Sequence, residues 1–291
     1  MRTAACVSRL GLFILAGGLF LPPEAECIVR RHDVDDQLYR DFGAEFPSVG
    51  RVLSSSSLGS GVLIHSRWVL TAAHLQNGSA PDTVDMGDSL YNVEEFITHP
   101  DWNGDVRDGN DLALARLAEP VFDVMPSDWY TGSDELNRIG VSVGFGRTGT
   151  GLTGQSQSAG VKRAAETMIE SVGSGSPFTP PHPPDDTLEY VFYSPEDNDV
   201  RPLEGMAAQG DSGGPVFIDF GDGFLIAGIH SFLWNVDEGD LATYGDAVVS
   251  TRVAAYDDWI MASIPEPRFS GVLGGSLALA LVLLARRRLK K

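Results

Sequence analysis

The sequence predicts an all-β protein, and two observations lead to that class. The 291 residues include 33 glycines and 17 prolines, and these turn-forming residues separate many short runs of Val, Ile, Leu and Phe. Short apolar runs bounded by turn residues are typical of strands rather than helices. The length allows either one large domain or two barrels that share an interface.

Both ends of the chain are predicted to be targeting segments. Residues 1–27 carry two arginines, then an apolar run over residues 10–21, then a short polar stretch. This is the layout of a secretory signal peptide that signal peptidase removes, with cleavage after Ala25 or Cys27. Residues 265–291 begin with Pro-Glu-Pro, continue as an apolar segment and end in arginines and lysines. That order predicts a short membrane span stopped by positive charge.

The C-terminal segment resembles the PEP-CTERM sorting tail of Gram-negative bacteria, which implies recognition by a membrane-embedded exosortase. A plain anchor fits the span and its charge equally well, and Pro265-Glu266-Pro267 favours the sorting tail. Either way, we expect an exported protein in the cell envelope or outside the cell, anchored to the membrane transiently or permanently by residues 265–291.

The body of the chain is acidic and poor in cysteine. The sequence has 40 Asp and Glu against 21 Lys and Arg, a formal net charge of −19. Such a charge argues against nucleic acid as a partner. Cys6 and Cys27 lie in or at the edge of the predicted signal, so residues 28–264 are expected to fold without an internal disulfide.

The candidate nucleophile is Ser212, within the stretch Gln-Gly-Asp-Ser-Gly-Gly-Pro at residues 209–215. Glycines on both sides allow a tight turn in which backbone N–H groups converge beside the hydroxyl. A serine hydroxyl is a weak nucleophile alone. It needs a histidine as base and a carboxylate to orient that histidine.

The candidate base is His74, which follows two predicted strands over residues 61–65 and 68–71. A single histidine after a strand is more often structural, and it is the motifs elsewhere in the chain that favour a catalytic role here.

The candidate carboxylate is Asp111, at the head of an apolar run over residues 112–117. Its position beside that run allows it to be buried. The competing Asp101, Asp105 and Asp108 stand in a hydrophilic loop and are expected to be solvated.

Three short motifs, in the order His, Asp, Ser, resemble the signatures of the chymotrypsin/trypsin family of serine proteases. They are Thr-Ala-Ala-His at 71–74, Asn-Asp-Leu-Ala-Leu at 110–114 and Gly-Asp-Ser-Gly-Gly-Pro at 210–215. The resemblance covers about residues 28–264. It implies two antiparallel six-stranded β-barrels, about 28–124 and 136–264, with the active site between them and a C-terminal helix near 253–263.

The activity that the resemblance implies is that of a secreted serine endopeptidase. It would hydrolyse proteins or peptides through an acyl-enzyme, with no metal and no cofactor. Ser212 would be the nucleophile, His74 the base and Asp111 its partner, and the N–H groups of Gly210 and Ser212 would form the oxyanion hole. A catalytically inactive protease fold that serves as a binding or adhesion module at the cell surface is the alternative.

The resemblance also implies an activation pair between Asp211 and a new N-terminal ammonium. Ile28-Val29, a typical start for this family, directly follows Cys27. We therefore expect signal cleavage itself to expose Ile28. Arg30-Arg31 replace the glycines that the family usually has there.

By the same resemblance, seven residues shape the substrate pocket. They are Met206, Gln209, His230, Ser231, Phe232, Leu233 and Val248. Met206 replaces the aspartate of trypsin-type enzymes, which predicts no cleavage after Lys or Arg. Leu233 and Val248 replace glycines and predict a small apolar P1 residue. His230 leaves an acidic P1 residue open, because glutamate-specific members hold the P1 carboxylate with a histidine in this strand. The alternative is that His230 is a structural histidine, buried in the core with its hydrogen bonds made.

Overall fold

The computed structural model describes residues 28–55, 57–76, 79–173, 186–236 and 239–264. The predicted signal peptide, 1–27, and the predicted C-terminal tail, 265–291, lie outside these ranges. Within them, no helix combines the length and the apolar character that a membrane crossing requires.

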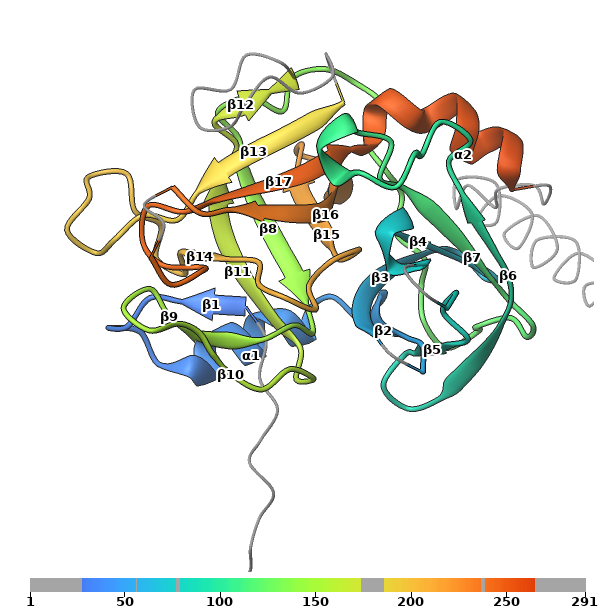
Figure 1. Ribbon diagram of the computed structural model, residues 1–291, viewed down its shortest axis with the longest axis horizontal. Helices are drawn as coiled ribbons and strands as arrows, with labels where there is room; N and C mark the ends of the chain where they lie inside the picture. The colour runs from blue at the N-terminus through green and yellow to red at the C-terminus, as the bar shows by residue number, and fades with distance from the viewer. Residues whose placement is uncertain (1–27, 56, 77–78, 174–185, 237–238, 265–291) are drawn as a thin grey trace, which may run out of the picture.

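Two β-rich halves lie side by side (Figure 1). The first is a closed six-stranded barrel with the order β2-β3-β4-β7-β6-β5. Its strands are β2 Val49–Leu53, β3 Leu58–His65, β4 Trp68–Thr71, β5 Thr83–Asp85, β6 Leu90–Thr98 and β7 Ala113–Leu117. All four residues of β4 are buried, and the strand pairs with a neighbour on each edge.

The second half is built on a seven-stranded antiparallel sheet with the order β11-β8-β15-β16-β17-β13-β12. These strands are β8 Ile139–Gly144, β11 Arg163–Met168, β12 Ser171–Val172, β13 Thr187–Val191, β15 Pro215–Asp219, β16 Phe224–Trp234 and β17 Ala247–Arg252. A smaller sheet, β10-β9-β1-β14, accompanies it. Its strands are β1 Ile28–Arg30, β9 Thr148–Thr150, β10 Gly154–Gln157 and β14 Gly205–Met206.

These two halves confirm the predicted all-β class and the first barrel. The second half differs in detail from the expected six-stranded barrel. Among the described strands it is a seven-stranded sheet whose two end strands, β11 and β12, do not pair with each other, so it forms a half-barrel.

The N-terminal segment packs with the second half, although the sequence reading grouped residues 28–124 with the first barrel. β1 pairs antiparallel with β14 and parallel with β9. An unforeseen helix, α1 (Asp36–Ala44), lies against β11. Asp35 caps the start of this helix, since its carboxylate accepts the Gln37 N–H, as Asp does at helix starts.

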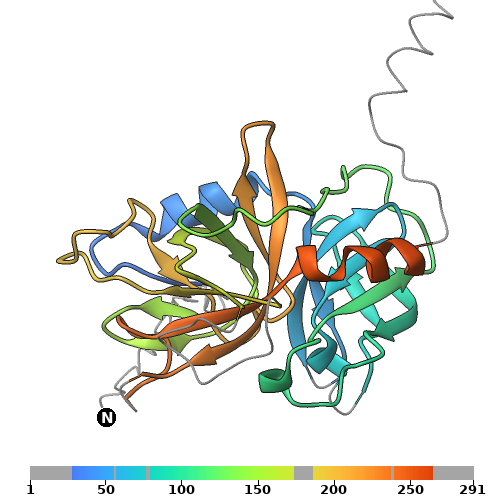
Figure 2. The same ribbon diagram turned by 90° about the horizontal axis from the view of Figure 1, so that it is seen from above.

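The C-terminal segment returns to the first barrel, as the predicted C-terminal helix requires. The 3₁₀ turn η4 (Val253–Tyr256) and helix α2 (Asp257–Ser263) follow β17, and Figure 2 shows them crossing to the barrel side. Ile260 is fully buried in the same core cluster as Leu112 and Leu114. This crossing holds the two halves together beside Asp111, where the candidate site lies.

Candidate active site

His74 and Asp111 meet because they stand just beyond the ends of two paired strands. β4 ends at Thr71, opposite Ala113 at the start of β7. A 3₁₀ turn, η1 (Ala73–Gln76), carries His74, and Asp111 lies two residues before the start of β7. The His74 Nδ1 lies 2.7 Å from Asp111 Oδ2, and the His74 backbone N–H donates to Asp111 Oδ1 at 2.8 Å.

The Asp111 carboxylate is 1 % exposed and firmly held. The Ser231 hydroxyl donates to its Oδ2, and Thr251 Oγ1 donates to the Asp111 carbonyl at 3.1 Å. An ionised carboxylate only accepts hydrogen bonds, so the proton of His74 belongs on Nδ1 and the lone pair on Nε2. Within the described residues Nε2 makes no hydrogen bond.

The three competing aspartates stay in solvent, as expected. Asp101, Asp105 and Asp108 are all exposed.

Ser212 lies in a turn that both halves hold in place. From β3, the Ser60 N–H donates to the Ser212 carbonyl at 2.8 Å, and the Ser60 hydroxyl donates to the Gly210 carbonyl at 3.1 Å. From β16, the His230 carbonyl accepts the Gly213 N–H at 2.8 Å. The residue after His230 is the serine that holds Asp111, so β16 joins the nucleophile turn to the His–Asp pair.

The turn around Ser212 leaves two N–H groups available to a ligand. The N–H groups of Gly210 and Ser212 make no hydrogen bond within the described part of the chain. Gly210 has φ +95°, a conformation that favours glycine. No hydrogen bond joins Ser212 Oγ to His74 among the described residues. Such contacts are often long before a substrate binds.

Asp211 points away from the nucleophile into the protein and is fully buried. Its carboxylate accepts the Gly146 N–H at 2.7 Å and the Ala208 N–H at 2.8 Å, and the Ile28 backbone N–H also donates to it. Burial raises the pKa of Asp211 to about 7, and the three N–H donors oppose that rise. Ile28 itself is fully buried and has φ +57°.

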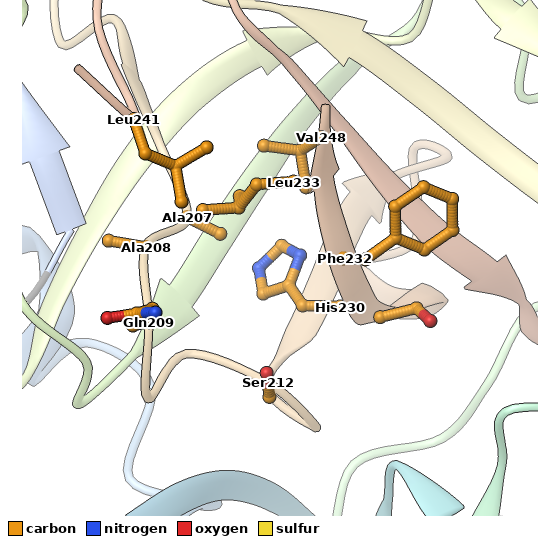
Figure 3. A pocket seen from close by; sticks show the side chains of 10 residues that line it. Ala207, Ala208, Gln209, Ser212, His230, Phe232, Leu233, Leu241 and Val248 are labelled. Atoms are coloured by element: carbon orange, nitrogen blue, oxygen red, sulfur yellow. The ribbon is translucent and has the colours of Figure 1, made fainter. Parts of the chain in front are cut away.

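A cavity of about 200 Å³ opens beside Ser212 (Figure 3). Its lining is Ala207, Ala208, Gln209, Ser212, His230, Ser231, Phe232, Leu233, Leu241 and Val248. Six of the seven predicted pocket residues are in this set. Met206 is not, because it is fully buried in a core cluster of the second half.

The lining combines apolar side chains with polar but uncharged ones, namely Gln209, Ser212, His230 and Ser231. His230 is 2 % exposed, its Nδ1 lies 3.2 Å from Ser250 Oγ and its Nε2 has no hydrogen-bond partner among the described residues. Burial lowers the pKa of His230 to about 3, so the ring is neutral. None of the described residues that line the cavity is Asp, Glu, Lys or Arg.

Sequence reasoning missed several residues that build this site. Ala207 and Ala208 could have been found, since they stand between two predicted pocket residues. Ser60 and Leu241 are far from any motif, and nothing local marks them.

Comparisons with known proteins identify the family of this chain. The family model described as Trypsin matches residues 42–260. The chain belongs to the trypsin-like serine protease family. The solved structure of neuropsin, a serine protease expressed in the limbic system of mouse brain, matches with a TM-score of 0.60 at 21% identity, over 80% of this chain and 98% of that one. That likeness shows the fold.

Curated members of the trypsin-like family align over most of this chain. Vitamin K-dependent protein C of Oryctolagus cuniculus is 30% identical over 70% of this chain and 46% of its own length. Complement C1s subcomponent of Rattus norvegicus is 30% identical over 74% of this chain and 33% of its own length. Chymotrypsin-like elastase family member 1 of Homo sapiens is 27% identical over 76% of this chain and 83% of its own length. The chain thus spans less than half of the first two relatives.

Proposed function

We propose that this protein is a secreted serine endopeptidase in which Ser212, His74 and Asp111 form the catalytic triad. The observation that carries the proposal is the pairing of His74 with a buried Asp111, through Nδ1 to Oδ2 at 2.7 Å and the backbone N–H to Oδ1 at 2.8 Å. This pairing aligns the imidazole and leaves Nε2 able to take a proton.

Each group has a chemical task in the proposed reaction. Ser212 Oγ attacks the scissile carbonyl carbon while His74 Nε2 takes the hydroxyl proton. His74 then gives that proton to the leaving amine, and water, activated the same way, releases the acyl group. The unoccupied N–H groups of Gly210 and Ser212 would bind the oxyanion, which contributes about 3 kcal/mol per donor.

The pocket favours a small apolar P1 side chain. Leu233 and Val248 both line the cavity. A P1 lysine or arginine would find no carboxylate in the described lining. A P1 glutamate would be buried beside a neutral His230 with no cation to offset its charge, which is costly.

Activation is proposed to follow from signal cleavage. Ile28 is buried with its backbone N–H on Asp211. Cleavage after Cys27 would convert that N–H into an ammonium and supply the charge that a buried carboxylate needs. Loss of one partner of such a pair costs about 3–5 kcal/mol. N-terminal sequencing of the exported protein should give a start at Ile28, and a fully active protein that starts at Glu26 would rule this out.

Export and sorting are proposed from the terminal segments. Signal peptidase would remove residues 1–27, and an exosortase would cut the PEP-CTERM-like tail within residues 265–291. Intact mass measurement of the protein in the envelope and in the medium tests both cuts. Retention of the whole tail in every fraction would favour a plain anchor.

The endopeptidase proposal is tested with purified exported protein and a peptide library varied at P1. We expect cleavage after Ala and other small apolar residues, and loss of cleavage in Ser212→Ala. Robust cleavage after Arg would refute the pocket assignment. Folded protein that cleaves nothing would support the inactive binding module.

A further inference from the structure

Asp111 stands at the centre of a tight turn whose backbone groups are bonded on both sides. The Asn110 carbonyl accepts the Leu112 N–H at 2.8 Å, and the Leu112 carbonyl accepts the His99 N–H at 2.9 Å. Asn110 itself has φ +58°, a left-handed conformation that asparagine adopts more readily than most residues. The direction of the Asp111 carboxylate therefore depends on how firmly Asn110 is held.

The Asn110 N–H is bonded to a buried tyrosine hydroxyl. It donates to Tyr256 Oη at 3.1 Å, and Tyr256 is 6% exposed. Tyr256 is the last residue of the 3₁₀ turn η4, which belongs to the segment that crosses from the second half to the first barrel (Figure 2). This contact ties the turn around Asp111 to the segment that joins the two halves.

A second buried carboxylate determines the direction in which the Tyr256 hydroxyl donates. The hydroxyl oxygen lies 3.1 Å from Asp186 Oδ2 and 3.3 Å from Asn110 Oδ1. Asp186 is 7% exposed, and a carboxylate oxygen is a stronger acceptor than an amide oxygen. The single hydroxyl proton therefore points to Asp186, and a lone pair of the oxygen faces the Asn110 N–H. Burial and the negative charge of Asp186 raise the pKa of Tyr256, so the hydroxyl keeps its proton.

The same strand holds the backbones of Asp186 and Asp111. Asp186 immediately precedes β13, and its carbonyl accepts the Arg252 N–H at 2.8 Å. The neighbouring Thr251 donates its hydroxyl to the Asp111 carbonyl at 3.1 Å. Both Thr251 and Arg252 belong to β17, so this strand is hydrogen-bonded to both buried aspartates.

We propose that Asp186 and Tyr256 are positioning residues for the proposed reaction. Asp186 orients the Tyr256 hydroxyl, whose oxygen holds the Asn110 N–H. The turn that Asn110 begins then sets the Asp111 carboxylate against His74. A hydroxyl that donates to a carboxylate becomes a stronger acceptor, so the two hydrogen bonds reinforce each other. The inference rests on the proposed function, because it takes His74 as the catalytic base.

The proton between His74 Nδ1 and Asp111 Oδ2 tests the inference without requiring catalysis. In the exported protein with Ser212→Ala, proton NMR observes this proton at low field, and saturation transfer measures its exchange with water. We expect Tyr256→Phe to speed that exchange about five- to tenfold, because the turn loses one hydrogen bond.

Two further variants and a control identify the contact responsible. Asp186→Asn should speed the exchange less, because the amide oxygen still accepts the hydroxyl proton but carries no charge. The double variant of Asp186→Asn and Tyr256→Phe should add little to Tyr256→Phe, since both changes act on one chain of hydrogen bonds. Tyr130→Phe also removes a hydroxyl bonded to a carboxylate, that of Asp134, and should leave the exchange at the parent rate.

Steady-state kinetics of protein with intact Ser212 give a second readout. Neither Asp186 nor Tyr256 is among the residues that line the substrate cavity. Tyr256→Phe should therefore lower kcat about five- to tenfold and leave KM unchanged. A loss that appears in KM alone would contradict the positioning role.

The outcomes separate this inference from the proposed function. If Tyr256→Phe and Asp186→Asn lower stability in urea without changing the exchange rate, or if Tyr130→Phe changes it equally, the inference is overturned. If Tyr256→Phe does not fold, Asp186→Asn carries the same test. If the parent shows no low-field proton, the His74–Asp111 bond is absent and the inference also falls. If the exchange responds as expected while protein with intact Ser212 cleaves no peptide, only the proposed function fails.

Discussion

At the scale of single residues, Asp111 acts on His74 through the position of one proton. Its Oδ2 accepts hydrogen bonds from the His74 imidazole and the Ser231 hydroxyl, while Oδ1 accepts one from the His74 backbone N–H. Every neighbour is a donor, so only an acceptor fits there. A carboxylate meets that requirement and an amide does not.

Asp111→Asn should therefore leave the fold intact and lower kcat by about 10⁴. The amide group must turn an N–H₂ toward one of these donors, which favours the wrong tautomer of His74. Steady-state kinetics measure the loss. The exposed Asp101→Asn serves as control and should keep the parent kcat. An Asp111→Asn enzyme with near-parent kcat would contradict the assigned role.

Position 213 requires a glycine, both because of its backbone conformation and because neighbouring atoms leave no room for a side chain. It has φ +83°, and an added Cβ would lie 2.1 Å from Thr71 Oγ1. Gly213→Ala should lower the free energy of unfolding by about 3–5 kcal/mol, from backbone strain and overpacking together. Gly221→Ala is matched in strain, at φ +109°, but has nothing within 4 Å, and it should cost about 1–3 kcal/mol. Equal losses in urea denaturation would show that the close contact is unimportant.

At the scale of elements, helix α1 is fastened to β11 by the ion pair of Asp36 with the buried Arg163, and the same carboxylate also pairs with Arg30 and Arg40. The Asp36 carboxylate accepts Arg163 Nε at 2.6 Å and Arg163 Nη2 at 2.5 Å. The Arg163 side chain is fully buried, whereas that of Asp36 is 13% exposed. Although burial raises the pKa of Asp36, the hydrogen bond and charge of Arg163 bring it below its ordinary value.

Asp36→Asn should lower the free energy of unfolding by about 3 kcal/mol, because it removes the charge of a carboxylate that accepts two hydrogen bonds from the buried Arg163 guanidinium. A lowered pKa in the folded state gives stability that is present above the unfolded pKa and lost as the pH falls. The difference from the parent should therefore shrink below about pH 4. Asp33→Asn removes an exposed partner of Arg31 and should cost less than about 1 kcal/mol. Equal costs would refute the fastening role.

How much could be predicted from the sequence depends on how local each signal is. His74, Asp111 and the Ser212 turn stand in short contiguous motifs, and the strand pairs that place His74 beside Asp111 are marked by apolar runs. Ser231 meets Asp111 across 120 positions, and Leu241 enters the cavity from a loop without a pattern. Such contacts depend on how distant segments pack, which a single sequence does not display.

At the scale of the whole molecule, the N-terminal segment extends through the second half to the residue beside Ser212. β1 joins β9 and β14, and Ile28 reaches Asp211 directly before the nucleophile. The segment therefore supports the turn that carries Ser212. The second half is complete only with this segment in place.

The state of the N-terminus should be visible as a pH dependence of stability. With residue 27 attached, burial raises the pKa of Asp211 to about 7, above its unfolded value. That raised pKa gives stability that is full below about pH 4 and is lost as the pH rises to 7, by up to about 4 kcal/mol. A Ser212→Ala chain that starts at Ile28 should lose much less between pH 5 and pH 8, since an ammonium then faces the ionised carboxylate. Identical losses in urea denaturation of the two forms would refute the pairing.

Covalent labelling tests the central claim, that Ser212 is an activated nucleophile, most directly. The exported protein is treated with a fluorophosphonate and its intact mass is measured. We predict one adduct, mapped to Ser212, that forms far more slowly in His74→Ala and is absent in Ser212→Ala. Folded protein that stays unlabelled, or is labelled equally in Ser212→Ala, would contradict the account.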